Sequence, residues 1–490
     1  CIFTKVEQDY RVILNEILLK PDWNKKFLDI EISNRWKQEI TNQKKDVSES
    51  FFKFLWAELE FLSHRILSVN FNGVVMDIFP TVGNGINFAS PDFHPDFLEK
   101  FHASASLLEN ASFRSEKFHP GSMNMQLDLI HPSNCCFVFN RSLMASRVGQ
   151  LTGDKTVDFH DINPTLYPNR FERFRYDFSL RREVDISEKH QWIPSDVHVD
   201  EEGRTRFLSY INDLDPQLNC GIEKPLECLL SNFIPLFELA ILSFQTYPPD
   251  RIKASCSNSQ FQPYTATDYY GDDEDDDNSE TRLAKYPITI PPLPDEFDPS
   301  IYNTERGVNP SISLRGRDLQ VIVKMSSIFL TPDQPQNDGG KWHLEGMTNE
   351  NIIATGIYYY SIENITTSRL TFRTYFERSD FEYEQNEYAG LEAVYGFRNN
   401  EDLPVQWAGE LEAREGLLAA FPNYAQHQVQ KFQLADPTKP GHRKIACFFL
   451  IDPKKPILSS SKIPQQNAEW FMHQLNAVFQ FALPELCLAR

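Results

Sequence analysis

The feature that most restricts the fold of this chain is a series of short apolar segments in its last third. Runs rich in β-branched and aromatic residues, such as "DLQVIVKMSSIFL", "NIIATGIYYYSIENIT" and "HRKIACFFLID", alternate with turns that contain Pro, Gly, Asn or Asp. Strands of this length and spacing are typical of an antiparallel sandwich or jelly roll. We therefore expect a jelly-roll core over residues 301–490, with a helix at its C-terminal end formed by "QQNAEWFMHQLNAVFQFAL".

The chain before this core has a different periodicity. "RVILNEILLK" and "ESFFKFLWAELEFLSHRIL" repeat apolar residues three and four positions apart, which suits amphipathic helices. "PLECLLSNFIPLFELAILSFQ" predicts a buried helix that ends before "YPPD", because proline stops it. The sequence thus predicts an α+β protein, with a mainly helical and irregular region at 1–174 and a helical region packing on the core at 175–262.

An acidic segment separates these regions from the core. Seven negative charges fall within the nine residues 272–280, and apolar residues are scarce there. Such a composition favours a solvated, mobile loop, so we interpret 263–300 as a loop and linker. The alternatives are a docking site for a basic partner or a weak calcium site, although the spaced Asp and fixed Gly of an EF-hand loop are missing.

Composition excludes several classes of function. A net charge of -21 repels phosphate backbones and anionic lipid, so nucleic acid is not an expected partner. The sequence contains no run of about 18 apolar residues, so we expect no membrane span. The eight cysteines form no C-x-x-C pair, and their apolar surroundings suit a reducing compartment. Because "CIFTKVEQDYRV" lacks a secretory signal, we expect an intracellular, cytoplasmic protein, although the N-terminus may be trimmed.

One motif offers chemistry. In "GGKWHLEGM", His343 and Glu345 are two residues apart, so on a strand both point to the same face. In "GLLAAFPNYAQHQVQKF", His427 follows an apolar strand and a Pro-Asn turn. Two imidazoles and one carboxylate on one side of an octahedral ion make the facial triad of non-haem Fe(II) oxygenases. Taken alone, H-x-E is weak, and the alternative is a histidine satisfied near a turn.

Longer blocks carry a resemblance to known proteins. "GGKWHLEGMTNENIIATGIYYYSIENITTSRLTFR", "EGLLAAFPNYAQHQV" and "FQLADPTKPGHRKIACFFLIDP" resemble conserved blocks of a large, mainly fungal family of uncharacterised proteins, with agreement over roughly residues 175–475. The order of H-x-acid, a "GLLAAFP" segment with a distal His, and a later Arg is similar to Fe(II)/2-oxoglutarate oxygenases such as prolyl hydroxylases. Their fold, a double-stranded β-helix, is what the resemblance implies for this core.

The resemblance also implies roles for individual residues. His343, Glu345 and His427 would bind Fe(II), and Arg443 would bind the far carboxylate of 2-oxoglutarate, a task that suits a planar guanidinium. The chain departs from the pattern in three ways. Its carboxylate is Glu rather than the commoner Asp, "FERSDFEYEQNEYAG" is inserted before His427, and Arg443 comes late. Lys444 and His442 are therefore alternatives to Arg443, and strand alternation decides among them.

The implied activity is oxygenation with O₂ and 2-oxoglutarate, which yields succinate and CO₂ while a C–H bond of a small-molecule or peptide substrate is oxidised. We expect the substrate pocket to include Trp342, Tyr358, Tyr360 and Arg373, although the tyrosines could equally pack within the sheet. The rival hypothesis is a catalytically silent jelly-roll scaffold that binds another protein. The sequence names neither the prime substrate, nor the type of oxidation, nor an oligomeric state.

Overall fold

A computed structural model describes residues 2–44, 47–71, 73–147, 150–156, 176–177, 182–183, 186–215, 217–218, 220–246, 248–252, 290–302, 313–376, 389–398, 401–467 and 470. Most of the acidic segment 263–300 lies outside these residues, as do most of the C-terminal helical stretch and most of the "FERSDFEYEQNEYAG" insertion. The predictions made for these three segments therefore remain predictions.

Three of the N-terminal helices begin at residues whose side chains act as N-caps. Thr4, Asp29 and Ser48 each accept a hydrogen bond from a backbone N–H in the first turn of the following helix, which satisfies a donor that the helix leaves free. The helices are α1 (Lys5–Leu18), α2 (Trp23–Lys26), α3 (Ile30–Gln43), α4 (Glu49–Ser63), α5 (Pro95–Arg114), α7 (Glu223–Leu242) and α11 (Ala389–Tyr395), with 3-10 turns η2 (Pro299–Tyr302) and η3 (Thr348–Glu350). The helical segments expected before residue 70 and near 225–245 are thus present.

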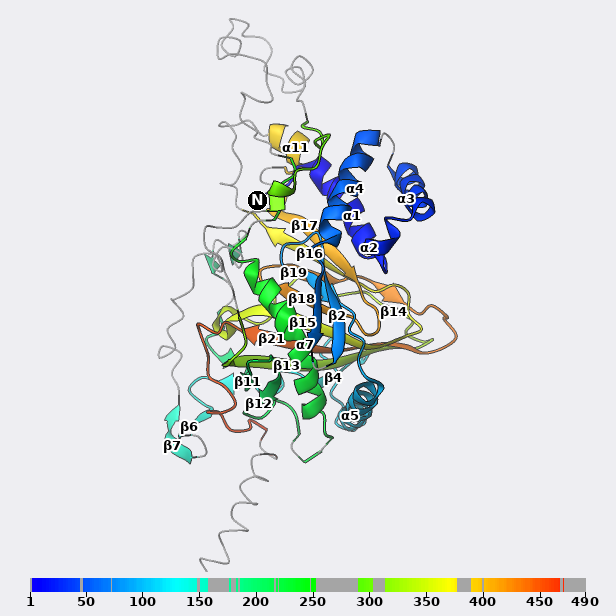
Figure 1. Cartoon of the computed structure of the whole chain (residues 1–490). Coiled ribbons are helices and arrows are strands. Elements are labelled where there is room, and N and C mark those ends of the chain that lie inside the picture. Colours follow the sequence, from blue (N-terminus) through cyan, green and yellow to red (C-terminus); the bar gives the residue numbers. More distant parts are fainter. Residues whose placement is uncertain are drawn as a thin grey trace, which may run out of the picture.

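A large antiparallel sheet forms the centre of the molecule (Figure 1). Its order is β1 (Leu67–Phe71), β2 (Val74–Pro80), β3 (Asn87–Ala89), β18 (Leu418–Pro422), β15 (Ile352–Glu363), β21 (Gly441–Ile451), β13 (Arg317–Leu330), β11 (Ser195–Val199) and β12 (Thr205–Phe207). A tenth strand, β4 (Gln126–Ile130), pairs with β13. The protein is therefore of the mixed α+β class, as predicted.

Smaller sheets complete the framework. Three strands pair in the order β17 (Val405–Glu412), β16 (Arg369–Tyr375) and β19 (Gln426–Val429). Two-stranded pairs join β14 (Gln336–Asn337) to β20 (Phe432–Gln433), β5 (Phe137–Val138) to β10 (His190–Gln191), β6 (Leu143–Arg147) to β7 (Gln150–Thr156), and β8 (Tyr176–Asp177) to β9 (Arg182–Glu183).

The two faces of the large sheet bury different cores. Alternate residues of β21, such as Phe448 and Leu450, pack with Phe233 and Phe237 of α7 on one face. Their neighbours, such as Phe449, belong to a second cluster that includes residues of β16 on the opposite face. This period-two alternation follows from the pleat of a strand. The large sheet and the three-stranded sheet therefore pack against each other through this second cluster. The candidate site borders it, because His427 contacts Phe372 of β16 and Phe421 of β18.

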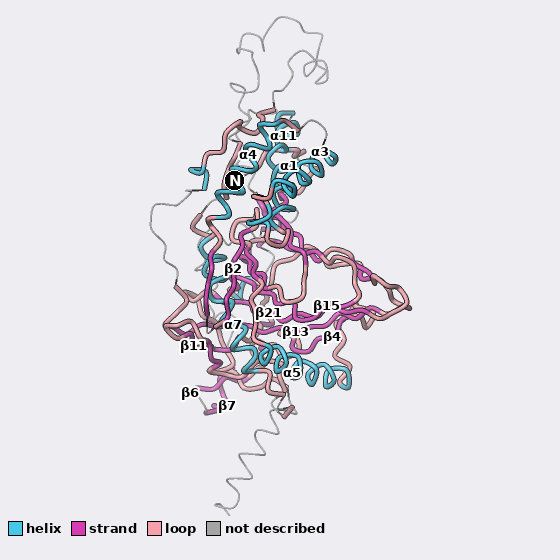
Figure 2. Tube along the Cα trace, turned by 45° about the vertical axis from the view of Figure 1, so that its right-hand side comes forward, coloured by secondary structure: helices cyan, strands magenta, loops and turns pink. Residues whose placement is uncertain are grey.

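The helices lie at separate places around this framework. α1, α3, α4 and α11 gather at one end of the molecule in both views, whereas α5 lies near the other end (Figures 1 and 2). α7 is, among the described helices, long and apolar enough to cross a membrane, but 72% of its apolar window is buried inside the protein. Its burial against the sheet accounts for that hydropathy.

Strands of the large sheet also come from the first half of the chain. Residues 1–174 are not only helical and irregular, because β1 to β4 come from this stretch and belong to the same sheet as β13 and β21. The 175–262 region likewise contributes β11 and β12. These strands have 3 to 7 residues, and β1 is largely exposed, so they carry too little apolar alternation to stand out.

Candidate metal centre

His343, Glu345 and His427 come together at the edge of the three-stranded sheet. Oε1 of Glu345 lies 3.3 Å from Nε2 of His427 and 3.8 Å from Nε2 of His343. One ligand atom from each of the three side chains can be chosen so that all lie within 4.8 Å of one another. Ligands bound about 2.1 Å from one ion at right angles are about 3 Å apart, so a slight contraction of this group would close it around a cation.

Backbone pairing brings the two histidines together. His343 and His427 form an isolated antiparallel bridge, in which each N–H donates to the carbonyl of the other, at 3.2 and 3.0 Å. Residues paired in this way present their side chains on the same face, and the two rings lie 4.3 Å apart. The two histidines are 84 residues apart in sequence, so strand pairing is what brings them together.

Asn423 positions the carboxylate, and the sequence did not single it out. Its side chain accepts from Glu345 N–H at 3.0 Å and donates to the carbonyls of Glu345 and Ile352 at 2.9 and 3.0 Å. Asn423 is 1% exposed, so these bonds are shielded from water. The Pro-Asn turn before His427 was the only available signal for this role.

The protonation of the group follows from its surroundings. Nδ1 of His343 lies 2.8 Å from the carbonyl of Lys341, which can only accept, so Nδ1 carries a proton and Nε2 faces Glu345. Burial alone would lower the pKa of His343, but Glu345 outweighs it and the pKa is raised. Burial lowers the pKa of His427, which favours the neutral ring.

Glu345 is held as an anion. Burial alone would raise its pKa, but His343, His427 and the charge of Lys324 together hold that pKa well below its ordinary value. Lys324 lies on β13 opposite Cys447 of β21, and burial raises the pKa of that thiol to about 12. Lys324 is a second residue that the sequence analysis missed. Its signal was a lysine inside the apolar run "DLQVIVKMSSIFL".

Strand alternation separates Arg443 from its two neighbours. Arg443 is 4% exposed and its guanidinium lies over the rings of Tyr359 and Phe432, at 5.3 and 5.8 Å. Lys444 instead pairs with Glu109 of α5 at 2.9 Å, and His442 bonds to the Ser361 hydroxyl at 2.7 Å. Lys444 thus faces the helix-covered side of the sheet, whereas Arg443 packs on Tyr359, which belongs to the opposite core cluster.

The structure does not gather all the expected substrate residues. Tyr358 and Tyr360 are 1% and 2% exposed and pack against Phe101 of α5, on the helix-covered face. Trp342 and Arg373 stack on each other at 4.5 Å. Both flank the histidine bridge, but adjacent strand residues point to opposite faces, so they lie on its outward side.

No curated protein matches the chain. TqaL, described as an Fe(II)/(alpha)ketoglutarate-dependent dioxygenase, is 13% identical over 75% of this chain and 94% of its own, with a TM-score of 0.23. A bsmA homolog from Methylobium petroleophilum PM1 is 8% identical over 28% of this chain and 43% of its own, with a TM-score of 0.18.

EvdO2 from Micromonospora carbonacea var. aurantiaca, whose crystal structure holds 2-oxoglutarate, is 9% identical over 26% of this chain and 52% of its own, with a TM-score of 0.14. The chain therefore spans about half the length of EvdO2 and of the bsmA homolog. TM-scores this low do not establish a shared fold. The sequence itself identifies the family, because one family model matches residues 49–474. The chain belongs to the family described as "Protein of unknown function (DUF4246)".

Proposed function

We propose that the core is a double-stranded β-helix and that the protein is an Fe(II)/2-oxoglutarate-dependent oxygenase. The strand order supports the fold, because β13, β15, β18 and β21 enter the large sheet while β16, β17 and β19 enter the three-stranded one. The segment after β14 joins β19 through the histidine bridge. The chain thus passes repeatedly between two facing sheets, as a jelly roll does.

The single observation that carries the proposal is the convergence of His343, Glu345 and His427. Two imidazole nitrogens and one carboxylate oxygen suit Fe(II), and a group of three leaves the remaining octahedral positions for other ligands. The side chain of His343 is 47% exposed, whereas that of His427 is 3% exposed. The group is therefore open on the His343 side and closed by protein behind His427.

Arg443 supports a site for the cosubstrate. Its Nε is buried without a hydrogen-bond partner among the described residues. A buried guanidinium with an unsatisfied donor is costly, and a carboxylate would satisfy it with charge-assisted bonds. Lys324 adds a second cation on the same sheet, nearer to Glu345. These two side chains would hold the dianionic 2-oxoglutarate.

When bound, Fe(II) and 2-oxoglutarate supply the activation of O₂, which ends in succinate, CO₂ and an oxidised C–H bond. The chain contributes position and environment. Asn423 fixes the backbone of Glu345, and the Lys341 carbonyl keeps the proton of His343 on Nδ1, so that binding displaces a proton only from Nε2. Phe421 and Phe372 pack around His427 at 4.8 and 6.4 Å and exclude water from that side.

Turnover tests the proposal directly. Protein reconstituted anaerobically with Fe(II) and then given 2-oxoglutarate and O₂ should form succinate, measured by mass spectrometry, and His343→Ala should abolish it. His198→Ala is the matched control, because His198 of β11 is a partly exposed histidine that also lies beside a carboxylate, that of Asp318 on β13. If the native protein neither binds iron nor forms succinate, the catalytically silent scaffold is the better account.

The two adjacent cations on β21 test the cosubstrate site. Arg443→Met should raise the KM for 2-oxoglutarate about tenfold to hundredfold, because bonds between charged groups contribute about 1.5–3 kcal/mol. Lys444→Met removes a cation one residue away that faces α5, and it should leave this KM unchanged. Equal KM values for the Arg443→Met variant and the native protein would remove Arg443 from the site.

A further inference from the structure

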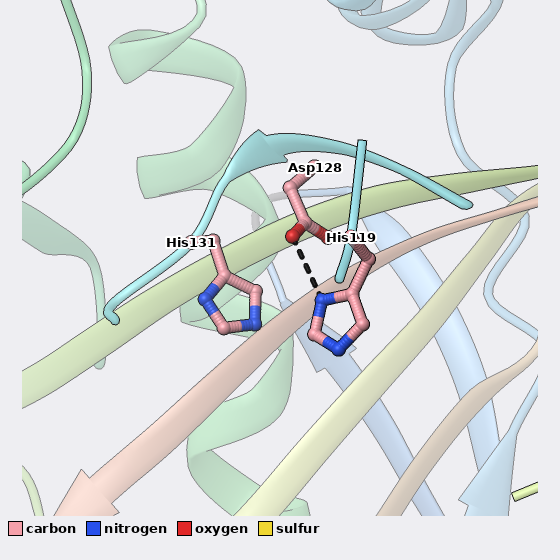
Figure 3. A group of neighbouring side chains, drawn as sticks. All are labelled: His119, Asp128 and His131. Atoms are coloured by element: carbon pink, nitrogen blue, oxygen red, sulfur yellow. Dashed lines mark hydrogen bonds and ion pairs between the residues drawn. The ribbon is translucent and has the colours of Figure 1, made fainter. Parts of the chain in front are cut away.

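A second group of possible metal ligands lies outside the candidate centre. Figure 3 shows His119, Asp128 and His131 as neighbours, with one nitrogen of His119 bonded to Asp128 and one nitrogen of His131 on the side of His119. One ligand atom from each side chain can be chosen so that all lie within 4.8 Å of one another. Asp128 is 3% exposed and His131 is 7% exposed, whereas the side chain of His119 is 38% exposed.

The backbone holds this group as firmly as it holds the first. His119 N–H donates to the Gln126 carbonyl and Asp128 N–H donates to the Lys117 carbonyl, both at 2.8 Å, around a bridge between Phe118 and Leu127. The pairing of β4 with β13 shifts register beside Asp128. Leu127, Leu129 and Ile130 all enter the core under the helices, while Asp128 bonds to His119 instead.

Hydrogen bonds orient Asp128, and burial keeps His131 neutral. Asp128 accepts from His119 Nδ1 at 2.9 Å through one oxygen and from Gln126 Nε2 at 3.1 Å through the other, which orients the carboxylate. Burial lowers the pKa of His131 to about 4, so its ring is neutral near pH 7, as a metal ligand must be. The partial exposure of His119 leaves a route for an ion from solvent.

We propose that His119, Asp128 and His131 form a second binding site for a divalent transition metal, of the kind that Zn²⁺ occupies with nitrogen and oxygen ligands. Two imidazoles and one carboxylate, with a water in the fourth position, complete a tetrahedral zinc site. The site is separate from His343, Glu345 and His427, since it draws on the 117–131 segment. The charges of Glu345 and Lys324 nevertheless act on His131, so both groups lie near the same interior.

Metal binding must exchange one hydrogen bond. His131 Nδ1 accepts from Ser133 N–H at 3.2 Å, so the neutral ring carries its proton on Nε2, the nitrogen that Figure 3 shows turned toward His119. A cation that takes the Nε2 lone pair releases that proton, and the ring gains one at Nδ1, where it conflicts with Ser133 N–H. We therefore expect the turn at 131–134 to rearrange when the metal binds. Hydrogen exchange should then be faster at the Ser133 amide.

Zinc binding in a background that lacks the first centre tests the proposal. His343→Ala/His427→Ala protein, stripped with a chelator, should still bind one equivalent of Zn²⁺ by calorimetry, and one equivalent of Co²⁺ with visible d–d absorption. Adding Asp128→Asn should weaken this binding at least about tenfold, since even outer residues of metal sites change affinity by 10–100-fold. His119→Gln should do the same and serves if Asp128→Asn fails to fold.

The control is another histidine–aspartate pair. His198 Nδ1 lies 2.7 Å from Asp318, but this pair belongs to neither group of three ligands found among the described residues. Asp318→Asn should leave zinc binding unchanged. The proposal is wrong if the His343→Ala/His427→Ala protein binds no Zn²⁺. It is also wrong if adding Asp128→Asn leaves the zinc affinity of that protein unchanged. Loss of succinate formation in native protein that retains this equivalent would count against the oxygenase alone.

Discussion

At the scale of single residues, Asn423 anchors the backbone that carries one ligand of the candidate centre. It lies directly after β18 and ties that strand to the loop that carries Glu345, 78 residues away. A single buried amide satisfies one backbone N–H and two carbonyls, groups that would otherwise lie unpaired in the interior. Asn423 therefore couples the stability of the fold to the position of a ligand.

Replacing this amide should affect both properties. We expect Asn423→Ala to lower the free energy of unfolding by about 1–3 kcal/mol, because buried polar groups lose their partners, and to weaken Fe(II) binding. Urea unfolding and metal titration measure the two effects. Asn364→Ala is the control, because Asn364 donates to carbonyls of the 436–440 turn and should lose stability without changing metal affinity. An unchanged metal affinity in Asn423→Ala would show that Glu345 needs no such support.

The length of the glutamate is a second prediction at this scale. Because Asn423 holds the Glu345 backbone on both sides, the chain cannot move to compensate for a shorter arm. Glu345→Asp withdraws the carboxylate by one C–C bond, about 1.5 Å, and should weaken Fe(II) binding at least about tenfold. Glu345→Gln keeps the length and removes the charge. If Glu345→Asp binds Fe(II) as tightly as the native protein, the two histidines must move toward the shorter carboxylate.

At the scale of elements, the connection from β14 to the histidine bridge depends on one glycine of the pair in "GGKWHLEGM". Gly339 adopts φ +84°, and a Cβ there would lie 2.4 Å from the Val429 carbonyl of β19. Gly340 has no such φ, and its nearest contact would be 3.8 Å away. The close approach of the two strands, which sets the bridge between His343 and His427, thus requires a glycine at 339 only.

The two glycines form a matched pair for a test. Gly339→Ala should lower the free energy of unfolding by about 1–3 kcal/mol, since it adds left-handed strain and a backbone clash, and it should weaken Fe(II) binding. Gly340→Ala should change the stability by less than about 0.5 kcal/mol. Thermal or urea unfolding measures both variants. Equal effects at the two positions would contradict the assigned role of Gly339.

At the scale of the whole molecule, a buried ionic cluster joins the helical end to the centre of the chain. Arg251 bonds to Glu7 of α1 and Glu58 of α4, and Tyr302 of η2 donates to Glu58. The side chains of Arg251, Glu7 and Glu58 are 0–1% exposed. Elements separated by up to 244 positions are thus held at one point.

Removing the cation should loosen this junction. Arg251→Met removes the guanidinium that bonds to two buried carboxylates, and we expect a loss of about 3–5 kcal/mol in the free energy of unfolding. Arg204→Met, which breaks exposed pairs with Asp200 and Glu202, should cost no more than about 1 kcal/mol. Urea denaturation followed by circular dichroism compares the two. A small effect at Arg251 would show that the helical end is held by its apolar core alone.

What could be predicted from the sequence is what local periodicity encodes. The spacing of apolar residues in "ESFFKFLWAELEFLSHRIL" and "PLECLLSNFIPLFELAILSFQ" predicts helices that the structure contains as α4 and α7. The alternating runs of the last third predict strands, and β13, β15 and β21 lie there. The H-x-E pair offered two possible ligands, because residues two apart on a strand share a face. His427 entered through spacing and resemblance.

The tertiary structure decided everything that depends on which strands become neighbours. The pairing of His343 with His427, the amide of Asn423 behind Glu345, and the approach of Asp128 to His119 and His131 are set by contacts across turns and between distant strands. Trp342 and Arg373 show the converse, since proximity in sequence put them beside the ligands but on the outward side. Local pattern determines the face of an element, whereas close packing of the whole chain determines what that face meets.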